Sequence, residues 1–178
     1  MKILFDSLTT VLILQRKMVQ EHCRQFSRSP SKGNLKRLKT LFAICGEDVF
    51  IESGFHLDYG SNVRLGDRVY ININCTIVDS PKDIKAPITI GDDCLIGPNV
   101  QFLSITHDLS SLDRLTQKNN YASAITLGNN VWLGGGAIIL AGVIIGDNSV
   151  IGAGSVVTKH VDANSFYAGN PAKKIKPL

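Results

Sequence analysis

The sequence predicts a mainly β protein, a parallel β-helix of six-residue repeats that follows a short α-helical segment. Read from Leu127, six consecutive hexads each begin with an aliphatic residue, and glycine follows it in four of them. The fifth position of each hexad is Val, Ala or Ser, which suits a narrow interior. The same phase occurs earlier, in "IGDDCL" from Ile90 and in "LGDRVY" from Leu65.

The repeat predicts a coil because one short rung cannot bury its apolar face alone and needs stacked neighbours. Three hexads per coil would give a triangular prism of parallel strands. The period alone does not give the hand of the coil, although parallel crossovers are usually right-handed. An ordinary β-sandwich would instead show alternation of period two over several residues, and the hexad phase disfavours it.

The domain organisation follows from a change of pattern near residue 46. Residues 1–45 are expected to be helical, and the opening "MKILFDSLTTVLILQRKMV" is interpreted as helix. Residues 46–178 are expected to form the β-helix domain with a C-terminal tail. The hexad phase slips twice, at 80–87 and at 107–124, where we expect departures from the coil.

Helical spacing supports the first part of this division, since apolar side chains recur on one side of each predicted helix. The second helix is expected to follow a break at Pro30 and Gly33. These side chains are Leu12, Val19, Cys23 and Phe26 in the first helix, and Leu35, Leu38, Leu41 and Phe42 in the second.

Composition is that of a one-domain soluble protein, with 178 residues, 44% hydrophobic and 19% charged side chains. A net charge of +4 suits a small polyanionic ligand, and no aromatic-plus-basic cluster of a nucleic-acid reader is present. Asp6 breaks the first apolar run, which is too short to span a membrane. We therefore expect a cytoplasmic protein without a nucleic-acid or membrane partner.

The cysteines support the same compartment. They form no CxxC pair and have no histidine at metal-ligand spacing, so reduced thiols are favoured over disulfides or zinc. They are Cys23, Cys45, Cys75 and Cys94.

Several motifs together resemble the maltose and galactoside O-acetyltransferases. They are "LDYGSNVRLGDRVYININCTIVD", "THDL" before a polar interruption, the long hexad run from Asn129 and "AGNPAKKIKPL". The resemblance covers about residues 48–178. It implies a left-handed β-helix, a homotrimer with active sites between subunits, and metal-free acetyl transfer from acetyl-CoA to a sugar hydroxyl in a ternary complex.

The resemblance also assigns the acceptor side of the site. His107 stands at the position of the catalytic histidine, a residue type whose ordinary pKa near 6.5 suits a general base. Asn72 matches an asparagine that binds the acceptor and steadies developing negative charge. Asp58 matches an acceptor-binding position, Asp79 is expected near the same acceptor cleft, and Trp132 is expected to form a wall beside His107.

The donor side needs exposed backbone for the pantetheine amides and cations for the phosphates. By the same resemblance, the acetyl-CoA contacts are expected from Gly135, Ala153, Thr158, Lys159, Lys173 and Lys176. The remaining histidines, His22, His56 and His160, are expected to be structural or to lie on the surface.

Two other functions remain open. An antibiotic acetyltransferase would share the prism and the histidine, but "LDYG" and "NIN" favour a sugar acceptor. A non-catalytic, metal-binding β-helix would need several histidines within the repeats, and the part of the chain from the hexad at Leu65 onward contains only His107 and the terminal His160. The family's second acceptor-site acid falls on Ser80 here, so the acceptor and the hydroxyl acetylated stay undefined.

Overall fold

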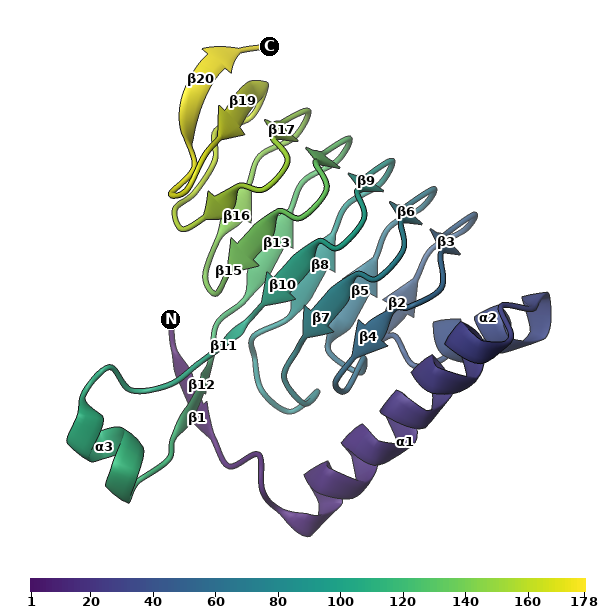
Figure 1. Ribbon diagram of the computed structural model, residues 1–178, viewed down its shortest axis with the longest axis vertical. Coiled ribbons are helices and arrows are strands. Elements are labelled where there is room, and N and C mark those ends of the chain that lie inside the picture. The colour runs from purple at the N-terminus through teal and green to yellow at the C-terminus, as the bar shows by residue number, and fades with distance from the viewer.

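The computed structural model describes residues 1–178, and most of the chain winds into a parallel β-helix with three faces (Figure 1). Each coil contributes one short strand to each of three parallel sheets, which we call faces I, II and III in the order in which the chain visits them. The turns between them stack into three corners, named I–II, II–III and III–I. This arrangement confirms the mainly β prediction.

The strands of each face stack in sequence order. Face I holds β2 (Ile44–Cys45), β5 (Val63–Leu65), β8 (Ile88–Ile90), β13 (Ile125–Leu127) and β16 (Ile144–Ile145). Face II holds β3 (Phe50–Ile51), β6 (Tyr70–Ile71), β9 (Leu95–Ile96), β14 (Trp132–Leu133), β17 (Val150–Ile151), β19 (Ser165–Ala168) and the antiparallel β20 (Lys173–Pro177). Face III holds β4 (His56–Leu57), β7 (Thr76–Val78), β10 (Gln101–Leu103), β15 (Ile138–Leu140) and β18 (Val156–Val157).

The hexad positions have the burial that the sequence pattern predicts. First-position aliphatics such as Leu127, Leu133 and Ile139 are at most 1% exposed. Fifth-position residues such as Val131 and Ala137 are equally buried and lie in the turns. The interior of the prism is therefore filled by one large and one small side chain per side.

The glycine that follows each strand of face I is required by the stacking of coils. A Cβ atom built on Gly91 would lie 2.5 Å from the carbonyl oxygen of Gly128 in the next coil. The backbone N–H of Gly91 donates to the carbonyl of Leu127 at 3.1 Å, which keeps the two coils at this spacing. No side chain fits there without pushing the coils apart.

Both phase slips are excursions at the III–I corner. The first occupies 79–87, between β7 and β8. The second occupies 104–124 and contains β11 (Ile105–Thr106), α3 (Ser111–Thr116) and β12 (Asn120–Ala122), which project from the prism as an arm (Figure 1).

The N-terminal residues depart from the helical expectation at Ile3–Phe5, which form strand β1 and pair antiparallel with β12 of the arm. Phe5 packs with Ala86 and Ala122 in a small second core, so a partner over a hundred residues away overrides the local pattern. Two helices follow, α1 (Thr10–Arg28) and α2 (Lys32–Lys39). The second ends earlier than expected, and Phe42 is buried beyond its end.

Helix α1 packs on β4 and covers the first coil. Val19, Cys23 and Phe26 are buried in the main core, which confirms the predicted apolar face. Leu12 instead packs against the small core around Phe5. The helices of this chain lack the combination of length and hydropathy that crossing a membrane requires.

Asp79 is buried at the III–I corner, where its carboxylate holds the next turn. Its two oxygens accept the backbone N–H groups of Tyr59 at 2.9 Å and Gly60 at 2.8 Å. Burial is the largest influence on this group and raises its pKa from 3.8 to about 7, against the lowering effect of those hydrogen bonds.

We predict that Gly91→Ala destabilises the protein by about 3 kcal/mol, because the added methyl meets the backbone of the next coil. The thermal midpoint at fixed protein concentration measures this loss. Gly33→Ala is the control, since the nearest atom to its Cβ is the Ser31 hydroxyl at 3.9 Å and alanine favours the helix. An unchanged midpoint for Gly91→Ala would contradict the proposed role of the close backbone contact.

We also predict that Asp79→Asn changes how stability depends on pH. An acid whose pKa is raised by folding binds its proton more tightly when folded, so its contribution falls as pH rises from about 4 to about 7. The stability of the native protein relative to the variant should fall by ~4 kcal/mol over this range. Urea unfolding at several pH values tests it, and parallel curves would show that Asp79 does not titrate there.

Candidate active site

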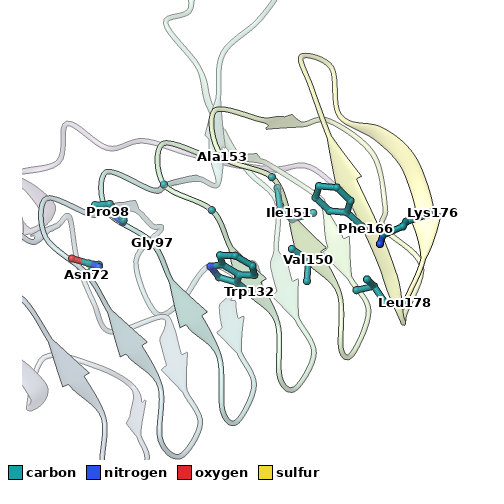
Figure 2. Close-up of a pocket in the computed structure, with 13 residues that line it drawn as sticks. Asn72, Gly97, Pro98, Trp132, Val150, Ile151, Ala153, Phe166, Lys176 and Leu178 are labelled. Atoms are coloured by element: carbon teal, nitrogen blue, oxygen red, sulfur yellow. The ribbon is translucent and has the colours of Figure 1, made fainter.

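A groove of about 580 Å³ lies on face II and the II–III corner, and it contains several of the predicted site residues (Figure 2). Asn72 follows β6 and lies at one end, while Lys176 of β20 lies at the other. Between them are Trp132 and the turn residues Gly135 and Ala153. The walls also include Pro98, Val150, Ile151, Phe166 and Leu178.

The groove has the composition of a site for a long, thin ligand with one charged end. Its middle is apolar and is lined by backbone at Gly97, Gly134 and Gly152. A Cβ at Gly135 would lie 3.2 Å from Pro98, so the absence of a side chain there keeps the groove open. Lys176 supplies positive charge at the opposite end from Asn72.

Asn72 is oriented by its own turn. Its Oδ1 accepts the backbone N–H of Ile73 at 2.8 Å, which leaves the Nδ2 amide as the donor of this side chain. An amide donor at the end of an apolar groove can stabilise an oxygen that gains negative charge.

His107 follows β11, where the arm leaves the III–I corner. Its Nδ1 lies 3.0 Å from the carbonyl oxygen of Asn119. A carbonyl only accepts, so Nδ1 carries a proton, and in the neutral ring Nε2 is then the acceptor. The ring is exposed.

A pocket of about 200 Å³ joins His107 to the acceptor-side residues. Asp58 and Asp79 line it with Arg16 of α1, although Asp79 is only 1% exposed and its oxygens are engaged by the turn. The other lining residues are Phe5, Ser7, Tyr59, Val78, Ile105 and Asn120. The excursion and the N-terminal segment thus enclose one small polar pocket.

Arg16 is a site residue that sequence reasoning missed. Its guanidinium donates to the Tyr59 hydroxyl at 2.6 Å and lies over the Tyr59 ring, 5.5 Å from its centroid. Nothing in the helical pattern distinguishes Arg16 from the other basic residues of α1. Its position depends on how α1 docks on the prism.

His56 also contacts this region, since its Nε2 lies 3.3 Å from Oδ1 of Asp58. The hydrogen bond to Asp58 raises the pKa of His56. His160, by contrast, accepts the backbone N–H of Ile144 through Nδ1 at 3.0 Å, a structural contact at the surface.

The predicted site residues fall at two different corners of one chain. Asn72, Trp132, Gly135, Ala153 and Lys176 line the groove at face II and the II–III corner, and none of them lines a pocket with His107. Trp132 is 54% exposed in this groove, so within one chain it is not the wall beside His107.

The remaining donor-side residues lie outside the groove. Thr158 and Lys159 follow β18 at the III–I corner, the corner that carries His107, and both are exposed. Lys173 is exposed on β20 and does not line the groove. No group of three or more His, Cys, Asp or Glu side chains is arranged to hold a metal ion.

Comparisons with known proteins agree with this architecture. Residues 124–159 match the family model "Bacterial transferase hexapeptide (six repeats)", and residues 87–105 match "Hexapeptide repeat of succinyl-transferase". A galactoside O-acetyltransferase of Escherichia coli is 43% identical over 141 residues, which are 79% of this chain and 66% of that enzyme. The chain therefore spans about two thirds of that relative's length.

Two solved structures superpose over nearly the whole chain. A maltose O-acetyltransferase from Clostridium difficile has a TM-score of 0.91 at 32% identity, and the match covers 99% of this chain and 93% of that one. A hexapeptide-repeat acetyltransferase from Vibrio cholerae, solved with acetyl coenzyme A, has a TM-score of 0.89 at 31% identity, covering 98% and 92%. The prism is accordingly a left-handed β-helix, and this chain belongs to the maltose and galactoside O-acetyltransferase family of hexapeptide-repeat proteins.

Proposed function

We propose that the protein transfers an acetyl group from acetyl-CoA to a hydroxyl of a sugar, with His107 as the general base. The observation that carries this proposal is the hydrogen bond between His107 Nδ1 and the carbonyl of Asn119, which leaves Nε2 as a free base beside a polar pocket. A hydroxyl is a poor nucleophile at neutral pH and needs such a base during attack on a thioester.

The groove of face II is the proposed acetyl-CoA site. Its apolar middle and exposed turn backbone fit a pantetheine arm, and Lys176 at its far end attracts phosphate. The related Vibrio cholerae acetyltransferase has been solved with acetyl coenzyme A, which supports this assignment. The thioester would lie at the Asn72 end.

In the proposed reaction, Nε2 of His107 takes the hydroxyl proton while the hydroxyl oxygen bonds to the acetyl carbon. The Asn72 Nδ2 amide donates to the thioester oxygen as that oxygen gains negative charge. The carbon–sulfur bond then breaks, and His107 returns its proton to the departing CoA thiolate. One proton is thus transferred twice, from the hydroxyl to His107 and from His107 to the thiolate, and the proposed reaction needs no metal.

The acceptor is proposed to bind in the pocket of His107. Asp58 would accept hydrogen bonds from sugar hydroxyls, and Arg16 would donate to a sugar oxygen. Asp79 would act mainly by holding the Tyr59–Gly60 turn behind Asp58. A sugar acceptor accords with the galactoside and maltose O-acetyltransferases among the relatives.

The two corners are proposed to meet between protomers of a homotrimer. The III–I corner of one chain would face the groove of its neighbour and bring His107 to Asn72 and Trp132. The same contact would carry Thr158 and Lys159 to the neighbour's acetyl-CoA, and Lys173 would add charge near the phosphates. This one contact between chains would bring together the two sets of residues that lie at separate corners of a single chain.

The reaction is proposed to occur in the cytoplasm, because all four cysteines are free and Cys75 and Cys94 are buried in the prism. Burial raises the pKa of the Cys75 thiol to about 11, which makes it an unreactive packing residue.

We predict that His107→Ala lowers kcat by at least ~10²-fold while the Kd for CoA stays nearly unchanged, because His107 would act on the hydroxyl proton and is not among the residues that line the groove. Thiol release from acetyl-CoA is measured with mono- and disaccharides, amino sugars and acetylatable antibiotics as acceptors. Activity on antibiotics alone would show that the protein is an antibiotic acetyltransferase and not a sugar acetyltransferase. Full activity of the variant on the best acceptor would exclude His107 as the base.

We further predict that inactive Asn72→Ala and His107→Ala chains regain activity when they are unfolded together and reassembled. In mixed oligomers, about one quarter of the interfaces would join an intact His107 to an intact Asn72. Each variant reassembled alone is the control. Absence of recovery in confirmed mixed oligomers would contradict the shared site.

A further inference from the structure

The Asn119 side chain, where the arm returns towards the prism, makes several hydrogen bonds next to His107. Its Nδ2 amide lies 3.2 Å from Oδ2 of Asp108, 3.1 Å from the Tyr121 hydroxyl and 2.9 Å from Oε1 of Gln117. Its own carbonyl is the acceptor that His107 Nδ1 contacts. One residue therefore joins the two ends of the arm and the proposed base.

These contacts form a closed set of polar groups at the base of the arm. Asp108 directly follows His107, and Tyr121 lies opposite Thr106 in the pairing of β11 with β12. The neighbouring Asp108 carboxylate is the main reason that the pKa of Tyr121 is raised. The Asn119 amide contacts both groups, with its Nδ2 within hydrogen-bond distance of the Asp108 carboxylate and of the Tyr121 hydroxyl. Asn119, Asp108 and Tyr121 thus hold one another.

The rest of the arm contacts the residues after His107 through Arg114, which donates to the Asp108 and Leu109 carbonyls, but it buries little apolar surface. Leu109, Leu112 and Leu115 are 92%, 65% and 73% exposed, and no residue of α3 is buried. Segments with so few buried contacts open readily. The Asn119 side chain bonds to Asp108 and Tyr121, and its own backbone carbonyl is the group that lies under His107.

We propose that Asn119 is a positioning residue, whose side chain, through Asp108 and Tyr121, holds its own carbonyl under His107 Nδ1. This contact sets both the ring orientation and the tautomer that leaves Nε2 free. The inference rests on the proposed role of His107 as the base. Any residue at 119 supplies a carbonyl, so the side chain acts on where that carbonyl lies.

The first test is Asn119→Ala in the full-length protein. We expect kcat to fall by about 10²-fold, as for a misplaced catalytic group, with KM for acetyl-CoA and for the acceptor changed less than about threefold. Thr116→Ala is the matched control, because Thr116 lies on the same arm and its hydroxyl bonds only to the Leu112 carbonyl. A kcat equal to that of the control would overturn the proposal.

A second readout follows the tautomer itself. Nitrogen-15 NMR of the four histidines, with His107 assigned by its loss in His107→Gln, should show protonated Nδ1 in the native protein. Asn119→Ala should shift this signal towards a mixture of tautomers. An unchanged signal would overturn the proposal. If His107→Ala keeps full activity, the proposed function fails, while the NMR signal still reports on Asn119.

Exchanging the donor and the acceptor between positions 108 and 119 distinguishes a lost hydrogen bond from misfolding of the arm. Asn119→Asp removes the amide donor and places two carboxylates together, so kcat should fall at least as far as in Asn119→Ala. Asp108→Asn alone keeps an acceptor and should cost little. The double variant Asp108→Asn/Asn119→Asp restores a donor–acceptor pair with reversed direction and should recover at least about tenfold of the lost kcat. No recovery in a double variant that still binds CoA would overturn the proposal.

Discussion

The spacing between stacked coils is the constraint on which the structure depends. Backbone hydrogen bonds such as that from Gly91 to Leu127 hold consecutive coils together along every face. After the strands of face I the coils approach so closely that a Cβ of Gly91 would touch the carbonyl of Gly128. The interior is equally narrow, so each turn must deliver one large aliphatic and one small residue inward. The faces and the interior consequently admit little variation.

Variation is confined to the corners, and the proposed chemistry lies there. The III–I corner takes both excursions, which carry Asp79 and His107, while the II–III corner stays short and forms the floor of the groove. A rigid prism cannot bend to bring its corners together. In the proposed function, assembly of chains would bring the base at one corner to the acetyl donor at another.

The periodic part of the fold was predictable from the sequence because its rules are local. The hexad phase identified Leu127, Leu133 and Ile139 as inward residues, and its two slips marked the excursions. Strand β1 was not predictable, because its pairing with β12 is non-local and outweighs the helical pattern. The same reason hid Arg16, whose place beside Tyr59 depends on the docking of α1. The engagement of Asp79 by backbone N–H groups also depends on a neighbouring coil, which no sequence spacing reveals.

The two ends of the prism differ from its middle in a way that concerns solubility. A stack of parallel strands offers open hydrogen-bonding edges at its first and last coils, and such edges invite further copies to add on. Here α1 packs over β4 at one end. At the other end β20 returns antiparallel against β19, with Lys173, Lys174 and Lys176 along it. The helix covers β4 at the first coil, and the charged reversed strand covers the edge of β19 at the last coil, so both elements disfavour the addition of further copies along the prism axis.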